Sequence, residues 1–480
     1  MKLKALLQDV ETKSVYTFDP EITNVTDNSS KVRRQGLFVC IKGNSFDGHD
    51  FAQKAMDRGA VAVICERDIG IKNSIIVEDS RKAYAQICSA FYSKAHKKLR
   101  MIAVTGTNGK TTTSYIIKKI LESSGLKTGL IGTVNVTIGK ERYPADLTTP
   151  DPVDLHRYLM LMNIAGCDAC VMEVSSQALE QERVYGINFD CAVFTNLSPE
   201  HLDYHKTMQN YARAKSKLFE MSKVSVINSD DEYAPLMLRS SAGKTYTYGT
   251  DENADFRAEK ICLSADGVDY SLSYKGKAYR VAFPGMGIFS VSNSLAAVSA
   301  ASVLGVDIPK AIREAERFEG ISGRMEKIDN SFGINIIIDY AHTPASLENA
   351  AKTLKEIYDG RLITVFGCGG DRDKDKRPMM GKIACENSDF VFITSDNPRT
   401  ENPEMIINDI LSGINTKNYY RITDRKLAIK SALYSAVKGD TVLIAGKGHE
   451  KYQIIGNQKI YFNEREIIRK LLEDKARFGK

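Results

Sequence analysis

The sequence predicts an α/β protein of about three domains. At 480 residues the chain is too long for one ordinary core, since a domain averages about 150 residues. Short apolar runs that suit buried strands alternate with segments whose apolar residues recur at helical spacing. Several of the strand-like runs end in glycine or polar residues, which is typical of ligand sites at the carboxyl ends of parallel sheets. The predicted domains are residues 1–96, 97–325 and 326–480.

The composition is that of a soluble globular protein, with 43% hydrophobic and 26% charged residues. No apolar run approaches the roughly 18 residues of a membrane span, and the N-terminus turns polar too early for a secretory signal. The nine cysteines have no disulfide-like spacing, which favours free thiols and a cytoplasmic location. Cys167 and Cys170 form a lone pair on an apolar segment, so core packing is favoured over zinc.

The net charge of +6 is mild and the sequence has no long basic block. Such a balance suits anionic small molecules and gives no indication of nucleic-acid binding.

The first domain reads as a strand at Gly36–Ile41, a helix at Phe51–Arg58 and a second strand at Val61–Ile64. This βαβ order predicts a small α/β domain. The polar, glycine-bearing loop Lys42–His49 joins the first strand to the helix. It is compatible both with a ligand-binding loop at a strand end and with a simple surface turn.

The second domain opens with a glycine loop between Met101–Val104, a predicted strand, and a predicted helix from Thr111 to about Ser124. In such a loop backbone N–H groups cradle phosphates, Lys110 reaches the terminal phosphates and Thr111 can bind magnesium. A strict P-loop would carry another glycine where Val104 stands. The strand before the loop and the helix after it nevertheless favour nucleotide triphosphate binding.

Further predicted strands follow at Gly129–Val136, Ala169–Glu173 and Ala192–Leu197. Glu173 ends a buried strand, a place where a carboxylate commonly serves magnesium in nucleotide-binding domains. His201 and His205 belong to a His-x-Asp-x-His string that could hold a transition metal. Because no other ligand cluster completes such a site, one histidine near a phosphate–magnesium centre is the more economical interpretation.

Tyr211 and Lys215 are four residues apart and share one face of a predicted helix. A lysine at such a position is ordinarily a solvated charge. Residues 225–290 are predicted as short strands and turns, followed by a helix of small residues, Ser294–Ala301.

The third domain contains four predicted strands that each end in charged, polar or glycine residues: Ile334–Ile338, Leu362–Phe366, Phe390–Thr394 and Thr441–Ala445. Four such ends predict a binding face at one edge of a doubly wound sheet. Arg372 and Arg399, which follow two of these strands, suggest that a carboxylate is held bidentately.

Taken in order, these motifs resemble the Mur ligases of peptidoglycan synthesis, in particular the members that add the third amino acid. The resemblance covers essentially the whole chain and rests on the strings Thr105–Thr112, Glu173–Ser176, Thr195–Leu197, His201–His205, Gly323–Glu326, Asp339–Pro344, Asp396–Arg399 and Gly446–Glu450. The short glycine loop, with Val104 in place of a glycine, is normal for this family.

The resemblance implies an N-terminal UDP-binding domain, a central P-loop ATPase α/β domain and a C-terminal Rossmann-like domain that binds the incoming amino acid. The implied reaction joins that amino acid to the γ-carboxyl of D-glutamate in UDP-MurNAc-L-Ala-D-Glu, through an acyl phosphate made from ATP. Two Mg²⁺ ions are expected as cofactors. The enzyme is expected to act as a cytoplasmic monomer with no nucleic-acid or membrane partner.

The resemblance also assigns roles to individual residues. The catalytic residues would be Lys110, Glu173, His201 and Lys215. The metal ligands would be Thr111, Glu173, His201 and Lys215, with Lys215 carbamylated to N6-carboxylysine. ATP would contact Thr105, Gly106, Thr107, Asn108, Gly109, Lys110, Thr111, Thr112, Asn293, Arg324 and Asp339. UDP-MurNAc-dipeptide would contact Ser29, Thr148, Thr149, Ser175, Gln181 and Arg183. The amino acid would contact Arg372, Asp396, Asn397, Pro398, Arg399, Gly446 and Glu450.

The Asp396–Arg399 string is the mark of family members that use meso-2,6-diaminopimelate. Arg399 would hold the carboxylate at the distal stereocentre, which lysine lacks. Three alternatives remain: the same ligase adding L-lysine or lanthionine, a folylpolyglutamate synthase, and a nucleotide-dependent module without chemistry. The second lacks an N-terminal uridine domain and this string.

Overall fold

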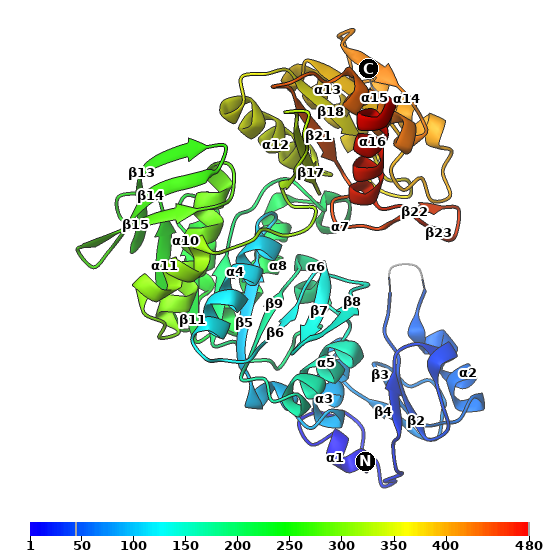
Figure 1. Ribbon diagram of the computed structural model, residues 1–480. Helices are drawn as coiled ribbons and strands as arrows, with labels where there is room; N and C mark the ends of the chain where they lie inside the picture. The colour runs from blue at the N-terminus through cyan, green and yellow to red at the C-terminus, as the bar shows by residue number, and fades with distance from the viewer. Residues whose placement is uncertain (44–45, 479–480) are drawn as a thin grey trace. The chain divides into compact units, whose positions relative to one another are not determined.

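The computed structural model describes residues 1–43 and 46–478 (Figure 1). Asn44 and Ser45 of the predicted Lys42–His49 loop lie outside the described residues. The chain forms two compact units. The first comprises Met1–Leu197, Thr207–Asp255 and Ala296–Glu314, and the second comprises Ser198–Lys206, Phe256–Leu295 and the chain from Ala315 onward. Among the described residues, no helix has both the length and the apolar character needed to cross a bilayer.

The first sheet of the first unit is parallel, with its strands in chain order: β1 (Asn24–Thr26), β2 (Gly36–Val39), β3 (Ala60–Cys65) and β4 (Ser74–Ile76). The predicted βαβ order is confirmed, because η2 (Gly48–Phe51) and α2 (Ala52–Asp57) connect β2 to β3. Helices α1 (Leu3–Leu6) and α3 (Ser80–Phe91) bury apolar residues with this sheet in one core cluster. Short 3-10 helices η1 (Ser29–Lys31) and η3 (Ala95–Lys98) follow β1 and α3.

The larger sheet of the first unit carries the glycine loop. Its strands run in the order β12-β11-β10-β5-β9-β6-β7-β8. The bounds are β5 (Arg100–Thr105), β6 (Thr128–Ile131), β7 (Asn135–Ile138), β8 (Glu141–Pro144), β9 (Ala169–Glu173), β10 (Cys191–Phe194), β11 (Val224–Asn228) and β12 (Lys244–Gly249). From β12 to β6 the strands are parallel, so their carboxyl ends meet at one edge.

Helices on this sheet are α4 (Lys110–Ser123), α5 (Pro152–Ile164), α6 (Ser176–Glu180), α8 (Met208–Glu220) and α9 (Ala234–Ser240). The predictions of a strand before and a helix after the glycine loop are confirmed by β5 and α4. The apolar run Met101–Val104 is fully buried, as expected for a parallel strand covered on both faces.

The prediction of one strand over Gly129–Val136 is wrong. The segment forms two antiparallel strands, β6 and β7, joined by residues 132–134. The physical reason is Glu173, which Gly132 and Thr133 contact. A Cβ on Gly132 would lie 2.3 Å from Glu173 Oε1, and the Thr133 N–H donates to the same oxygen at 2.9 Å.

The second unit contains an antiparallel meander of β13 (Phe256–Ser264), β14 (Gly267–Tyr274) and β15 (Lys277–Phe283). These strands are longer than the sequence patterns suggested. Helix α10 (Ile288–Val303) begins in this unit and contains the predicted small-residue helix, and α11 (Ile308–Glu316) follows it. The short helix α7 (Leu202–His205) also belongs to this unit.

The third sheet has the order β16-β17-β21-β18-β19-β20, and all but β16 are parallel. Its strands are β16 (Glu326–Ile328), β17 (Asn335–Asp339), β18 (Leu362–Phe366), β19 (Phe390–Ile393), β20 (Tyr419–Arg421) and β21 (Thr441–Ala445). The four strands predicted for this region are confirmed as β17, β18, β19 and β21.

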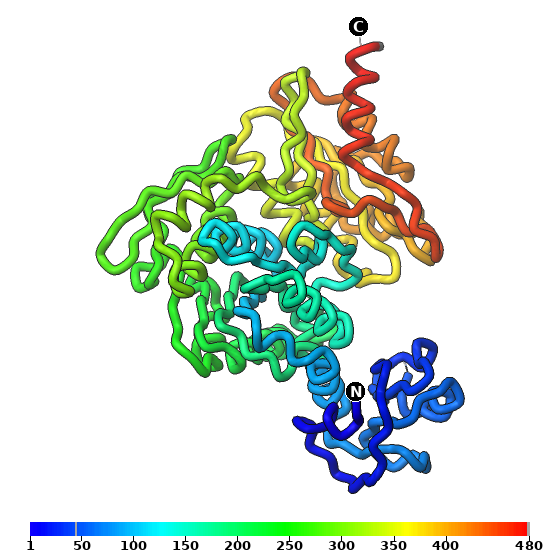
Figure 2. The backbone as a smooth tube through the Cα atoms, turned by 60° about the horizontal axis from the view of Figure 1, so that its bottom comes forward, coloured from blue at the N-terminus to red at the C-terminus, as the bar shows by residue number. Residues whose placement is uncertain are grey.

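Helices cover both faces of this sheet, since successive strand residues alternate between two core clusters. One face packs on α12 (Pro344–Ile357), α13 (Lys376–Asn387) and α14 (Pro403–Leu411), and the other on α15 (Arg425–Ser435) and α16 (Glu464–Phe478) (Figure 1). Figure 2 shows the hairpin β22 (Tyr452–Ile455) and β23 (Gln458–Tyr461) leading directly into α16.

Candidate active site

The glycine loop runs from the end of β5 to the start of α4 and contains Thr105 to Thr112. Gly106 has φ +150°, and a Cβ there would lie 1.9 Å from Thr195 Oγ1. Gly109 has φ +84° at the N-cap of α4. Both positions therefore require glycine. Val104 lies inside β5, fully buried, so the loop turns without the additional glycine of a strict P-loop.

The loop is tied to the chain that follows β10. The Asn108 N–H donates to Asn196 Oδ1 at 3.0 Å, and Asn196 Nδ2 donates back to Asn108 O at 3.1 Å. Thr195 Oγ1 donates to Asn108 O at 2.6 Å. Sequence reasoning assigned Asn196 no role; its place in the Thr195–Leu197 string was the only signal. These bonds fix the glycine loop against the end of β10.

Two lysines converge on one carbonyl of the loop. Lys110 Nζ donates to Gly106 O at 2.9 Å and to Thr107 O at 2.8 Å, and Lys215 Nζ donates to Gly106 O at 2.8 Å. Lys215 is 1% exposed and its Nζ lies 4.7 Å from the centre of the Tyr211 ring. Lys215 is therefore not the solvated charge that a helix lysine ordinarily is, because this face of α8 packs into the core. The prediction that Tyr211 and Lys215 share a helix face is confirmed.

Glu173 accepts hydrogen bonds from the glycine-loop helix and from the β6–β7 turn. Its fully buried carboxylate accepts from Thr111 Oγ1 at 3.0 Å and from Thr133 Oγ1 at 2.9 Å. A carboxylate next to a hydroxyl at a phosphate-binding loop is a donor set that fits Mg²⁺, which prefers oxygen ligands and completes its shell with water or phosphate. Within residues 1–43 and 46–478, no group of three or more His, Cys, Asp or Glu residues could hold a metal ion.

The predicted dipeptide contacts form a continuous cluster beside Glu173. Thr149 Oγ1 donates to Glu173 O at 2.9 Å and accepts from the Ser175 N–H at 3.0 Å. Arg183 donates to Thr149 O at 2.9 Å and to Gln181 Oε1 at 2.7 Å. Thr148 joins the cluster through its hydroxyl, which lies 3.1 Å from Thr133 Oγ1. These residues could receive a polar substrate next to the glycine loop.

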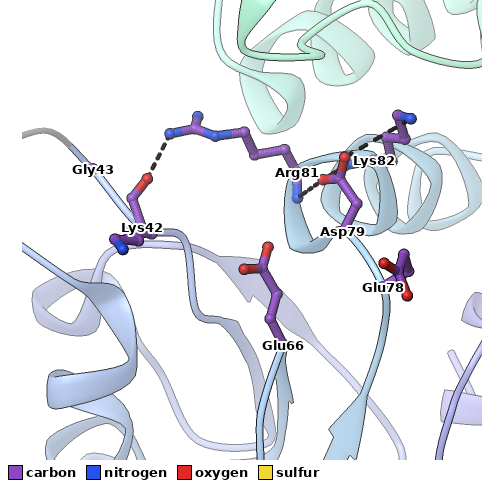
Figure 3. A pocket seen from close by; sticks show the side chains of 7 residues that line it. All are labelled: Lys42, Gly43, Glu66, Glu78, Asp79, Arg81 and Lys82. Carbon is purple, nitrogen blue, oxygen red and sulfur yellow. Dashed lines mark hydrogen bonds and ion pairs between the residues drawn. The ribbon is translucent and has the colours of Figure 1, made fainter.

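A charged pocket of about 570 Å³ lies at the carboxyl-end loops of the first sheet (Figure 3). Its lining residues are Lys42, Gly43, Glu66, Glu78, Asp79, Arg81 and Lys82. Arg81 reaches from α3 to Lys42 O, at 2.7 Å, and Glu66 accepts from Ser80 Oγ at the same helix start. Lys42 and Gly43 come from the predicted loop, so a described part of that loop faces a cavity. Ser29 begins η1, after β1.

The other predicted ATP residues, Asn293, Arg324 and Asp339, belong to the second unit, as does the predicted metal ligand His201. Asp339 ends β17 and accepts from the Met325 N–H at 2.7 Å. Burial raises the pKa of Asp339, and the positive charge of Arg324 opposes this rise. The Arg324 guanidinium lies 4.5 Å from the centre of the Tyr340 ring. Asn293 is buried on α10, while His201 lies 3.7 Å from Glu200 Oε1.

Arg372 and Arg399 flank the glycine-rich loop after β18. A Cβ built on Gly369 would lie 3.0 Å from Arg399 Nη1 and 3.7 Å from Arg372 Cγ. Burial and the positive charge of Arg372 lower the pKa of Arg399. Arg399 is half-buried and Arg372 is exposed. Two neighbouring guanidinium groups attract an anion, and their planar forks match a carboxylate.

Asp396 and Asn397 lie beside these arginines and contact the end of β21. Asn397 donates to Glu450 Oε2 at 2.9 Å and accepts from Lys447 Nζ at 3.0 Å. Gly446 has φ +116°, and a Cβ there would lie 3.0 Å from Asp396 Oδ2. Pro398, between Asn397 and Arg399, has its carbonyl oxygen against Gly370. The structure thus gathers the residues predicted to bind the amino acid at the carboxyl ends of β18, β19 and β21.

Comparison with known proteins identifies the family. The chain matches the Mur ligase catalytic domain over residues 21–105, the Mur ligase middle domain over 104–301 and the glutamate ligase domain over 323–448. It is 44% identical over 480 residues to UDP-N-acetylmuramoyl-L-alanyl-D-glutamate–2,6-diaminopimelate ligase 1 of Clostridium acetobutylicum, covering 99% of this chain and 100% of that one. The chain belongs to the Mur ligase family.

Solved structures of Mur ligases have the same fold. A UDP-N-acetylmuramoyl-L-alanyl-D-glutamate–2,6-diaminopimelate ligase matches this Mur ligase with a TM-score of 0.72 and 35% identity, over 99% of each chain. The MurF ligase of Thermotoga maritima in complex with ADP matches with a TM-score of 0.63 and 21% identity, over 94% of this chain and 98% of that one. The predicted α/β architecture is therefore confirmed. The domain boundaries and the residue roles stay predictions.

Proposed function

We propose that this Mur ligase uses ATP to join meso-2,6-diaminopimelate to UDP-MurNAc-L-Ala-D-Glu in peptidoglycan synthesis. The observation that carries the proposal is the full-length match to a ligase named for this reaction, at 44% identity. Because the substrates would be a nucleotide-linked precursor and ATP, we expect the reaction to take place in the cytoplasm. A monomeric enzyme remains the prediction from the sequence.

The glycine loop is the ATP end of the proposed site. Lys110 and the loop N–H groups bind the phosphates, and the helix dipole of α4 adds positive potential where the γ-phosphate lies. Thr111 and Glu173 would hold one Mg²⁺, and His201 with carbamylated Lys215 would serve a second. When bound, these ions neutralise the charge that two approaching anions would otherwise place against each other.

Carbamylation of Lys215 is part of the proposal. The neutral form of this amine, whose side chain is 1% exposed, would add CO₂ and lose a proton. The product is an anionic carbamate, whose oxygen atoms are suitable magnesium ligands. The unmodified amine donates to Gly106 O, so the side chain already reaches the phosphate-binding loop.

The reaction would proceed in two steps. The D-glutamate γ-carboxylate attacks the γ-phosphorus, ADP leaves, and an acyl phosphate forms. The amine of diaminopimelate, after losing a proton, then attacks the acyl carbon and expels inorganic phosphate. Thr148, Thr149, Ser175, Gln181 and Arg183 would hold the dipeptide end beside Glu173, which orients the attacking carboxylate.

The amino-acid end explains the choice of diaminopimelate over L-lysine. Arg372 and Arg399 would hold the distal carboxylate between their guanidinium groups. Asp396 and Glu450 would accept hydrogen bonds from the distal ammonium, with Asn397 and Gly446 shaping the pocket. Lysine lacks the carboxylate and would leave both arginines without an anion.

The test is ADP release by the purified enzyme with UDP-MurNAc-L-Ala-D-Glu and a panel of meso-diaminopimelate, L-lysine and lanthionine. We expect ADP release that depends on both substrates and is fastest with diaminopimelate. Lysine or lanthionine used at least as well would refute the amino-acid choice. ATP hydrolysis that ignores both substrates would refute the ligase reaction and favour a nucleotide-dependent module.

A further inference from the structure

A buried arginine, Arg377, lies behind the pair Arg372 and Arg399 and takes no part in the proposed contacts with substrate. It is the second residue of α13, and its side chain is 0% exposed. Burying a guanidinium is costly unless its donors are paired. The hydrogen-bond partners of Arg377 show which parts of the structure it fixes.

Arg377 contacts both loops that carry the substrate arginines. Its Nη2 donates to Gly369 O at 3.2 Å, in the loop that leads to Arg372. Its Nη1 and Nη2 donate to the two carboxylate oxygens of Glu401 at 3.0 and 2.9 Å, in the loop that follows Arg399. A further bond, from Nη1 to Asp409 Oδ2 at 2.8 Å, fixes the guanidinium against α14.

Glu401 also accepts a hydrogen bond from the loop that leads to Arg372. Its Oε1 accepts from the Asp371 N–H at 2.6 Å. Thr400 Oγ1, one residue earlier, donates to Asp371 Oδ1 at 2.8 Å. The hydrogen bonds with Arg377 lower the pKa of Glu401 to about 2, so the carboxylate is ionised at neutral pH.

The two loops also touch directly, so their relative position is tightly defined. The Gly370 N–H donates to Asn397 O at 2.9 Å, and Arg399 Nη1 donates to Gly370 O at 2.6 Å. A Cβ on Gly370 would lie 1.9 Å from Pro398 O, so the backbones are as close as glycine allows. Arg399 itself has φ +50°, an unfavourable value for a residue with a side chain, and the surrounding contacts must maintain it.

We propose that Arg377, through its paired bonds to Glu401 and Gly369, is a positioning residue that sets the spacing of Arg372 and Arg399 and thereby the preference for an amino acid with a distal carboxylate. The inference rests on the proposed function. Two guanidinium forks can share one carboxylate only within a narrow range of distances, and a misplacement of about 1 Å in such a site costs about 100-fold. Lysine has no distal carboxylate, so its use does not depend on this spacing.

The test is Arg377→Lys, which keeps the charge but cannot bond both oxygens of Glu401 and Gly369 O with one planar group. We expect the KM for diaminopimelate to rise by about 10-fold to 100-fold, the cost of weakening a charged hydrogen bond. The KM values for ATP and UDP-MurNAc-dipeptide, and kcat/KM for L-lysine, should stay within about 2-fold of the wild-type values. The ratio of kcat/KM for diaminopimelate to that for lysine therefore falls.

Two further variants separate positioning from loss of stability. Glu401→Gln keeps the shape of the acceptor and removes its charge, and it should lower the same ratio even if Arg377→Lys does not fold. Asp440→Asn is the matched control. It breaks a paired contact with Arg361 in the same unit, where Asp440 accepts at 2.6 and 3.2 Å next to the amino ends of β21 and β18. It should reduce stability and leave the ratio unchanged.

The proposal is overturned if folded Arg377→Lys and Glu401→Gln keep the wild-type ratio, or if activity with lysine falls by the same factor as activity with diaminopimelate. A wild-type enzyme that shows no diaminopimelate-dependent ADP release would instead refute the proposed function.

Discussion

A buried histidine pair in the first unit gives a prediction whose size follows from the structure. His156 on α5 is 0% exposed, and its ring centre lies 5.6 Å from that of His96 on η3. Neither ring nitrogen of His156 has a hydrogen-bond partner among the described residues. Burial, followed by the neighbouring His96, lowers the pKa of His156 from the ordinary 6.5 to about 3.

The sign of the pH dependence of stability follows because His156 binds a proton more readily in the unfolded chain than in the folded protein. The folded pKa is depressed, so the stability linked to His156 is complete above about pH 6.5 and falls as pH drops toward 3. At about 1.4 kcal/mol per pH unit, protonation of the unfolded chain costs the fold about 2 kcal/mol by pH 5. His156→Leu removes this dependence. It also removes an unpaired buried polar group, so at pH 7.5 it should be as stable as the wild type or more stable by about 1 kcal/mol.

Hydrogen exchange of the α5 amides is measured at pH 7.5 and 5.0 and corrected for intrinsic rates. It reports the free energy of local opening, which suits a multidomain chain better than a global unfolding transition. Between these pH values the local opening free energy should fall by about 2 kcal/mol more in the wild type than in His156→Leu. Leu159→Met, on the same helix and fully buried, is the control and should follow the wild type. Equal losses in wild type and His156→Leu would refute the assignment of the pH dependence to this ring.

Two predictions concern the glycine loop. Gly106→Ala should weaken ATP binding by at least about 10-fold in a titration, because the methyl group would overlap Thr195 Oγ1, whereas Gly125→Ala, which has φ +91° and no atom within 4 Å, should bind ATP normally. Normal ATP affinity in Gly106→Ala would contradict the loop geometry. Lys215→Ala should lose ligase activity by more than about 100-fold, without recovery in excess bicarbonate, and near-normal turnover would remove the carbamate from the reaction. Its control is Lys217→Ala, which removes a partly exposed lysine paired with Glu180 and Glu182.

The sequence predicted the elements where one physical signal was dominant. Met101–Val104 is apolar throughout because β5 is buried on both faces, and the same holds for the strands of the third sheet. The prediction failed at Gly129–Val136, where the apolar pattern continues through a turn. That turn exists because Gly132 and Thr133 must contact Glu173, a residue about forty positions later, and no local pattern encodes such a contact.

Lys215 and Arg377 show why the candidate site could be predicted only in part. Helical spacing placed Lys215 beside Tyr211, yet the spacing does not state whether that face meets water or another element. A charged side chain is exposed by default, and the default fails where the fold supplies acceptors: Gly106 O for Lys215, and Glu401 with Gly369 O for Arg377. Gly106 O and Gly369 O lie just beyond the carboxyl ends of β5 and β18, where backbone groups leave the ladder and need partners. Buried cations therefore gather where this sheet architecture also binds ligands, and a lysine or arginine following such a strand merits attention as more than a surface charge.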